Sequence, residues 1–120
     1  MRRIAAASLL LALAALATEA SAARHGKRQL WGAIAYSSSS GAYGYAVDRK
    51  TKRDAESEAF RQCGDCDVIK TFRDSCGAIA EKPARFAWET GASQQIVERK
   101  ALQKCGSECR IAVWACTSEK

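Results

Sequence analysis

The feature that most constrains the fold of this chain is an internal repeat. The tetrapeptide Gly-Ala-Ile-Ala occupies residues 32–35 and returns at residues 77–80. The same features follow each copy: two aromatic residues at alternating positions, a stretch ending in Cys-Gly, a second cysteine and a short apolar run. The offset between copies is 45 residues at the first motif and 42 to 43 at the later ones, as small differences in loop length would produce. The sequence therefore predicts a tandem duplication, with repeats at residues 31–75 and 76–120.

Each repeat has the pattern of a β-β-α-β unit. In the first repeat, residues 31–36 have the composition of a strand, and residues 42–47 alternate strictly between larger and small side chains, which is the period of a strand. Apolar residues then recur on one helical face over residues 55–63 and stop at Gly64, and the second repeat has the same spacing up to Gly106. We therefore expect an α+β domain with about six strands in an antiparallel or mixed sheet and two helices packed on it.

The start of the chain has the composition of a signal peptide. A basic start with two arginines precedes a continuous apolar run over residues 4–17, and a small-x-small pattern follows at residues 20–22. The apolar run is too short for a transmembrane helix, and no other stretch is long enough to span a bilayer. We therefore expect cleavage of residues 1–22, a flexible basic lead at 23–30, and a single exported domain at 31–120, periplasmic or extracellular, with no transmembrane segment after cleavage.

The six cysteines of an exported chain predict disulfides, which a domain of this size needs for stability. Six cysteines allow 15 pairings. The interpretation we prefer staples the corner after each helix and closes the second repeat on itself, with the pairs Cys63–Cys66, Cys105–Cys109 and Cys76–Cys116. The main alternative pairs equivalent positions of the two repeats, Cys63–Cys105 and Cys66–Cys109.

Two functional alternatives use the same thiols. Four cysteines in Cys-x-x-Cys and Cys-x-x-x-Cys spacing are a reasonable zinc site, but an oxidising compartment disfavours it. A redox-active pair at Cys63 and Cys66 is disfavoured because redox pairs lie at helix N-termini, whereas Cys63 is expected at a helix C-terminus, where the dipole opposes a thiolate. We therefore expect neither a metal nor another cofactor.

The sequence contains no recognisable catalytic arrangement. His25 is the sole histidine and lies in the lead, so no Ser-His-Asp or Cys-His arrangement can form inside the domain. Carboxylates are numerous, but none is placed in a pattern that marks an acid/base pair. No glycine-rich phosphate loop follows a strand. We expect a protein that is not an enzyme.

The candidate binding residues are aromatic and basic. The two aromatic pairs, at residues 43/45 and 86/88, occupy equivalent strand positions, and we expect them to share one sheet face. If that face meets the helices they are core, which is the favoured interpretation. If it is open, aromatic side chains form a platform for a sugar or a peptide. The candidate contact residues are Trp31, Tyr43, Tyr45 and Trp88, with a positive rim of Arg49, Lys50, Lys52 and Arg53.

The net charge of +6 favours acidic partners, but acidic residues interrupt the basic run at residues 49–53. A solvated helix face explains this mixture better than a stripe for nucleic acid, so we expect no specific nucleic-acid binding. The sequence does not determine the oligomeric state.

An ordered set of segments covers nearly all of the chain after the leader. These segments are Trp-Gly-Ala-Ile-Ala-Tyr-Ser at 31–37, Gly-Ala-Tyr-Gly-Tyr at 41–45, the helix at 55–63, Cys-Gly-Ala-Ile-Ala at 76–80 and the closing segment at 105–116. In combination they resemble a family of small exported bacterial proteins known as domain of unknown function 4189. The chain departs from the family pattern at residues 86–88, where the family is richer in glycine. The resemblance implies secretion and a disulfide-stapled duplicated domain, and it implies no reaction and no catalytic residues.

Together these observations favour a secreted or periplasmic, non-catalytic binding module. Its expected partner is a protein or an acidic envelope polymer, and its role is that of an inhibitor, an immunity-type protein or an effector. One alternative is an envelope hydrolase that uses paired carboxylates. Another is a purely structural envelope protein without a discrete ligand.

Overall fold

The structure is a computed structural model, and it describes residues 29–118. The predicted signal peptide at 1–22 lies outside the described residues, as do residues 23–28 of the predicted lead and the last two residues of the chain. Leu30, at the end of the lead, is tied to the domain. Its main-chain nitrogen donates to Asp74 Oδ1 at 2.9 Å, and its carbonyl accepts from the main-chain nitrogen of Asp74 at 2.9 Å.

The described residues repeat one order of elements. The first repeat contains β1 (Trp31–Tyr36), β2 (Tyr43–Arg49), α2 (Lys52–Cys63) and β3 (Val68–Arg73). The second contains β4 (Cys76–Lys82), β5 (Arg85–Gly91), α3 (Gln94–Cys105) and β6 (Arg110–Cys116). In each repeat the strand that carries the Gly-Ala-Ile-Ala motif is the central one, and the sheet orders are β2-β1-β3 and β5-β4-β6. All pairs are antiparallel.

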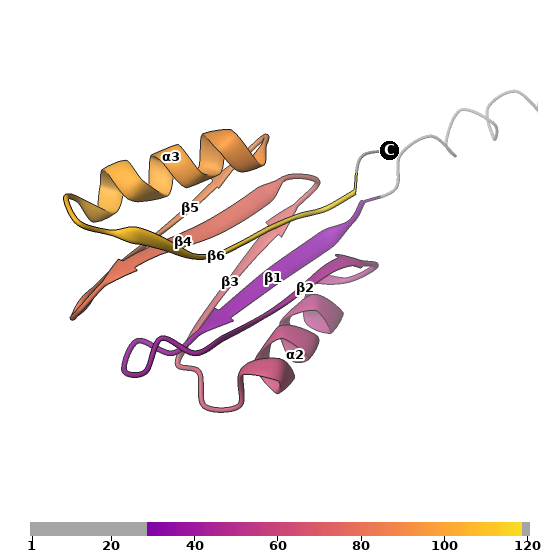
Figure 1. The fold of residues 1–120 in the computed structure, drawn as a ribbon. Coiled ribbons are helices and arrows are strands. Elements are labelled where there is room, and N and C mark those ends of the chain that lie inside the picture. The colour runs from indigo at the N-terminus through magenta and orange to yellow at the C-terminus, as the bar shows by residue number, and fades with distance from the viewer. Residues whose placement is uncertain (1–28, 119–120) are drawn as a thin grey trace, which may run out of the picture.

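The predicted α+β fold is confirmed, and residues 29–118 contain six strands, two helices and three cysteine pairs. The strands form two sheets of three instead of a single sheet. The two sheets stack face to face, and each carries one helix on its outer side, so the layers run α2, first sheet, second sheet, α3 (Figure 1). The physical reason is that the central strands are buried on both faces and need cover on both.

The repeated motif supplies the contacts for every layer. In the first repeat Ala33 and Ala35 pack under α2, while Ile34 points to the other sheet. In the second repeat the alanines at 78 and 80 pack under α3, and Ile79 meets Ile34 in the cluster between the sheets. Alanine lets a helix approach the sheet closely, and isoleucine fills the space between the sheets. The motif therefore specifies both packing surfaces of its strand.

Local signals set the ends of both helices. Thr51 accepts a hydrogen bond from the main-chain nitrogen of Asp54 at 3.1 Å, and Ser93 accepts one from that of Ile96 at 3.2 Å. These contacts satisfy main-chain donors that the first turn of a helix leaves without partners. Each helix stops at a glycine with positive φ, 83° at Gly64 and 104° at Gly106.

All six cysteines lie in the described residues and are paired. The pairs are Cys63–Cys66, Cys76–Cys116 and Cys105–Cys109, the same set as the preferred interpretation from the sequence. Two pairs close the corners after the helices, and the third joins directly opposite residues of β4 and β6. Within residues 29–118 neither helix has the length and apolar character needed to cross a membrane.

Candidate functional site

The stacked sheets leave two sides of the molecule where strand edges meet. On one side β2 lies against β6, and on the other side aromatic rings join β3 and β5. Because β2 corresponds to β5 and β3 corresponds to β6, the duplication makes these two sides equivalent. We call them the β2/β6 edge and the β5/β3 edge. The side chains on the two edges differ, and that difference defines the candidate site.

The β5/β3 edge is filled by aromatic side chains. Phe72 of β3 is 4% exposed, and its ring centroid lies 6.2 Å from that of Trp88. A Cβ atom built on Gly32 or Gly77 would come within 3.0 Å of the Phe72 ring, so the two glycines make room for it. Phe86 packs on Tyr36 of β1 with 5.2 Å between centroids. This edge is therefore core.

The β2/β6 edge is open. Tyr43 and Tyr45 correspond to Phe86 and Trp88, but they are 48% and 46% exposed. Ala115 of β6 pairs with Gly77 as Phe72 pairs with Gly32, so a methyl group stands where the other edge has a ring. The space that remains is a cleft of about 660 Å³.

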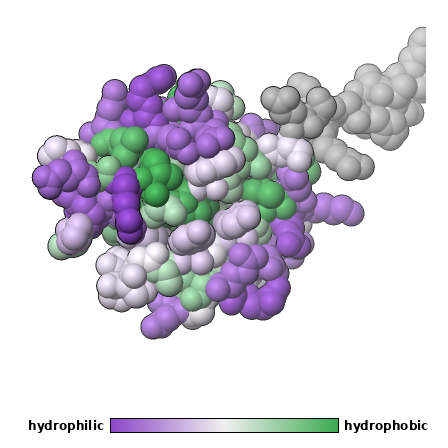
Figure 2. Space-filling model, in the orientation of Figure 1, coloured by the Kyte–Doolittle hydropathy of each residue, from purple (hydrophilic) through white to green (hydrophobic). Residues whose placement is uncertain are grey.

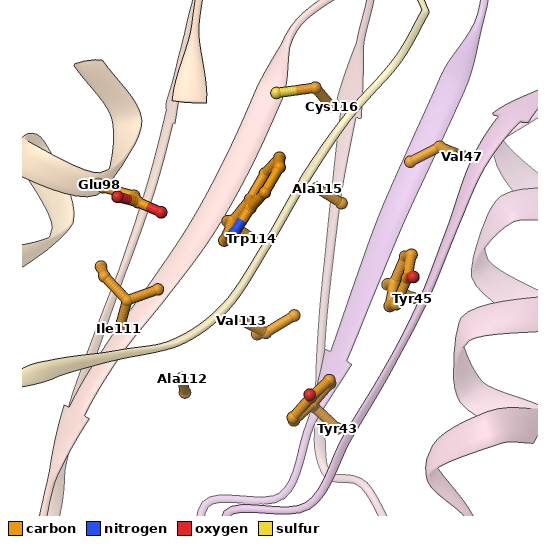
Figure 3. Close-up of a pocket in the computed structure, with 10 residues that line it drawn as sticks. All are labelled: Tyr43, Tyr45, Val47, Glu98, Ile111, Ala112, Val113, Trp114, Ala115 and Cys116. Carbon is orange, nitrogen blue, oxygen red and sulfur yellow. The ribbon is translucent and has the colours of Figure 1, made fainter. Parts of the chain in front are cut away.

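The cleft is lined by β2, by residues 111–116 of β6 and by Glu98 of α3 (Figure 3). Figure 2, in the orientation of Figure 1, shows hydrophobic residues gathered in the middle of this face, with hydrophilic residues above and below them. The β2 side of the cleft presents Tyr43, Tyr45 and Val47. A concave apolar surface with exposed rings is the usual form of a contact site.

Trp114 is a cleft residue that the sequence did not single out. It is 42% exposed and pairs with Ala78, so it lies on the α3 face of β6, whereas Val113 and Ala115 lie on the face toward the other sheet. Glu98 stands beside it (Figure 3), and its Oε2 accepts from Gln94 Nε2 at 3.1 Å. The signal that could have found Trp114 is a large aromatic residue between Val113 and Ala115 in the last strand.

The structure brings two of the four predicted aromatic contact residues together and separates the others. Tyr43 and Tyr45 share the cleft, whereas Trp88 lies in the β5/β3 edge and Trp31 packs on the α2 side of β1. The Arg73 guanidinium lies 5.4 Å from the centroid of the Trp31 ring. The predicted positive rim is exposed and runs from the end of β2 into the start of α2, at Arg49, Lys50, Lys52 and Arg53.

A second, polar cavity of about 400 Å³ lies beside the two hairpin turns. The Tyr36 hydroxyl donates to Glu81 Oε1 at 2.6 Å, and Arg110 donates to Glu81 Oε2 at 3.3 Å. Burial, and then the hydrogen bond to Glu81, raise the pKa of Tyr36 above its ordinary value. Tyr36 and Glu81 occupy equivalent positions of the two repeats, so this contact joins the two sheets. Both carboxylate oxygens of Glu81 already have donors.

The carboxyl groups of Asp67 and Glu58 have lowered pKa values, and both groups lie outside the cleft. Hydrogen bonds from the Ser38 hydroxyl and main-chain nitrogen lower the pKa of Asp67 and hold the β1–β2 loop. Arg61 and then Gln62 lower the pKa of Glu58 on the exposed side of α2. Among residues 29–118, no group of three or more His, Cys, Asp and Glu side chains is arranged to hold a metal ion.

With this geometry in hand, the class of the protein follows from comparison with known families. The sequence model of the family described as domain of unknown function DUF4189 matches residues 31–116, and the chain belongs to that family. Among solved structures, the chain is similar to the NMR structure of Rv1813c from Mycobacterium tuberculosis, with 30% sequence identity and a TM-score of 0.63. The match covers 95% of this chain and 97% of that one. No curated protein matches the chain.

Proposed function

We propose that this small, oxidised domain is a non-catalytic binding module, and that the β2/β6 edge is its contact surface for a protein partner. One observation carries the proposal. Five large apolar side chains are exposed in the described residues, and three of them, Tyr43, Tyr45 and Trp114, line the same cleft. Aromatic side chains of this kind dominate the energetics of protein interfaces because they bury a large area and carry a polar atom that can hydrogen-bond.

The internal comparison supports the same assignment. If the tyrosines served only to pack the two sheets, their edge would be closed as the β5/β3 edge is closed. Instead the strand opposite them carries Val113 and Ala115, which are too small to cover the rings. Exposed apolar area has a cost in water that a bound partner would remove.

An acidic envelope polymer is the alternative partner, and the positive rim would bind it. The four basic residues at 49–53 are exposed, but Asp48 and Asp54 flank them in the chain. Asp48 is itself engaged, since its Oδ1 accepts from the main-chain nitrogen of Ser118 at 2.7 Å. A polymer held by such a surface would dissociate as salt screens the charges. We place the module in the periplasm or outside the cell, because three disulfides persist best in an oxidising compartment.

The test is capture from an envelope extract of the source organism, using the immobilised, oxidised protein at low and then high salt. The key variant is Tyr45→Ala with Trp114→Ala. The matched control is Phe60→Ala, because Phe60 is 43% exposed but lies on α2, away from the cleft. We expect a stoichiometric protein that survives high salt and is captured by the wild type and the control but not by the double variant. Equal capture by the double variant, or recovery of anionic polymer alone that high salt removes, contradicts the proposal.

A further inference from the structure

The two sheets of the described residues have four edge strands, and three of these are protected by side chains against pairing with another chain. On β5, Lys100 Nζ donates to the carbonyl of Thr90 at 2.8 Å and Lys104 Nζ to that of Trp88 at 3.4 Å. On β2, Gln62 of α2 accepts a hydrogen bond from the main-chain nitrogen of Tyr45 at 3.1 Å. β3 carries two positive charges within six residues. Side chains that occupy edge groups and charges on edge strands are the devices by which natural sheets avoid pairing with other chains.

β6 has neither kind of side-chain protection along residues 111–116, and the bulge in its pairing with β4 lies at Ala112, before the regularly paired residues 113–116. This stretch reads Ile-Ala-Val-Trp-Ala-Cys, and the one charged residue of the strand, Arg110, stands at its start and binds Glu81. Among the described residues, no side chain hydrogen-bonds to the main chain of residues 111–116. An apolar edge strand whose main-chain groups no side chain occupies is a template on which another extended segment can pair.

The side chains around this edge are placed to hold such a segment. Trp114 stands on one face of β6, and Tyr43 and Tyr45 stand beyond the other, so the cleft wraps around the free edge of the strand (Figure 3). Successive side chains of an added strand point to opposite faces. They would therefore contact Trp114 and the two tyrosines alternately, while the main chain pairs with β6.

Glu98 indicates the charge of the occupant. Among residues 29–118 it is the one charged side chain that lines the cleft, and within that part of the chain Oε2 alone of its two oxygens accepts a hydrogen bond. A lysine or arginine on the Trp114 face of the added strand would meet both the free carboxylate oxygen and the indole ring. Pairing of two β6 strands from two copies would bring together two Glu98 carboxylates and no free cation, since Arg110 is engaged with Glu81.

The geometry points to strand addition at β6: the protein partner inserts an extended segment, with an aromatic or large apolar side chain toward Tyr43 and Tyr45 and a basic side chain toward Trp114 and Glu98. The inference rests on the proposed function, since it names how the same cleft binds its partner. In this mode of binding, the alternating side chains of the added segment give specificity, and the main-chain hydrogen bonds to β6 give affinity for any extended segment.

The experiment is panning of a phage-displayed library of random dodecapeptides on the oxidised protein. We expect an enriched family with apolar and aromatic residues at alternating positions and a lysine or arginine in the interleaved set. Binding of the synthetic peptide should weaken by about tenfold or more in Trp114→Lys and in Tyr45→Lys, a loss of at least ~1.4 kcal/mol. In the control Phe60→Lys, the affinity should stay within about twofold of the wild type. Glu98→Gln should remove the preference for the basic residue. Circular dichroism verifies that each variant is folded.

A second arm separates strand addition from binding in the cleft by side chains alone. N-methylation of alternate main-chain nitrogens of the peptide removes the donors that pair with β6 and keeps the side chains. In one of the two N-methyl registers we expect a loss of about tenfold or more. If neither register matters while Trp114→Lys still abolishes binding, strand addition is wrong and the proposed binding site stands. Absence of any enriched family, or peptides that bind Trp114→Lys and Tyr45→Lys as well as the wild type, overturns both proposals. A dimer of the free protein that Trp114→Lys dissociates overturns the choice of partner in favour of a second copy.

Discussion

The two edges of this sandwich derive from the same duplicated elements and have diverged in opposite directions. At the β5/β3 edge, Phe72 fills the space over the two motif glycines and packs on Trp88. At the β2/β6 edge, Ala115 replaces the ring and leaves Tyr45 nearly half exposed. One edge therefore contributes to stability and the other retains apolar surface that the fold does not use. This exposed apolar surface is the one that we propose for a partner.

The ends of the two central strands show the same divergence. Cys76 and Cys116 face each other at one end of the second sheet, and the corresponding residues of the first sheet are Trp31 and Arg73. The second repeat therefore has a covalent link where the first repeat has a cation–π contact. The distance from the guanidinium carbon to the centroid of the ring in that contact is 5.4 Å. The second repeat is the more strongly fixed of the two, and it also carries β6, the edge strand whose main-chain groups no described side chain occupies.

Removal of the Phe72 ring should have the largest effect on stability. Phe72→Ala empties a buried site between the sheets, and we expect it to lower the free energy of unfolding by about 4 kcal/mol. Its counterpart at the open edge, Tyr45→Ala, should cost less than about 1 kcal/mol, because the ring is already half in water. Urea unfolding of the oxidised proteins measures both. Similar costs for the two substitutions would show that the edges are equally part of the core.

Removal of the strand-end contacts should rank next. Replacing Cys76 and Cys116 together by alanine opens a link between residues 40 apart in the chain, which is worth between about 3 and 4 kcal/mol by loop entropy. Arg73→Ala removes the cation and keeps the Trp31 ring packed on the α2 side of β1, so it should cost about 1 kcal/mol, the scale of a cation–π contact near the surface. Unfolding curves of the two variants, each checked for its remaining disulfides, give the comparison. Equal losses would contradict the view that the second repeat is the more strongly fixed.

A smaller effect is expected where the helices meet the sheets. A Cβ atom at Gly44 would lie 2.3 Å from the carbonyl oxygen of Ala59 and 2.8 Å from the main-chain nitrogen of Cys63, and these main-chain atoms cannot move aside. Gly44→Ala should therefore cost about 2 kcal/mol. The corresponding residue on β5 is already an alanine, Ala87, and Ala87→Gly should cost about 1 kcal/mol or less. A neutral Gly44→Ala would mean that α2 lies no closer to its sheet than α3 does.

The smallest expected effect on stability comes from the Tyr36–Glu81 contact between the sheets, and it is seen at alkaline pH. The raised pKa of Tyr36 means that the folded state prefers the neutral phenol, whereas the unfolded chain ionises near the ordinary value of 10.0. The stability from this contact is complete below pH 10 and is lost as the pH rises from 10 toward the raised pKa. Urea midpoints at intervals from pH 8 to pH 11 should fall at the upper end in the wild type. Tyr36→Phe should reduce that fall, and an identical pH profile in both proteins would contradict the assignment.

Much of the fold could be predicted from the sequence because its signals are local. The repeated Gly-Ala-Ile-Ala motif identifies the two central strands. The helical spacing of apolar residues, followed by a glycine, identifies the two helices. The alternation of residues along a strand shows which side chains share a face of the sheet. It does not show whether a helix or a second sheet covers that face. The alanines at 33 and 35 proved to face a helix, and Ile34 proved to face a second sheet. The continuous burial of β1 follows from that double cover.

The candidate site could be predicted only in part, because the pairing of β6 with β4 contains one irregularity. Tyr43 and Tyr45 follow from simple alternation in β2. Trp114 does not, because the register between β4 and β6 shifts between Ile79 and Ala80. The shift places Ile111 and Trp114, three residues apart, on the same face of β6, whereas regular alternation would put them on opposite faces. A bulge of this kind has no reliable signal in a single sequence.

The most direct test of the central claim, that the β2/β6 edge is the binding surface, is an NMR map of amide shifts in the oxidised protein during titration with a peptide obtained by panning. We predict that the largest amide shift changes fall on residues 111–116 of β6 and 43–47 of β2. The amide shifts of residues at the β5/β3 edge should not change. Shifts centred on Phe60 and Ile69, or around the Tyr36–Glu81 cavity, would contradict it.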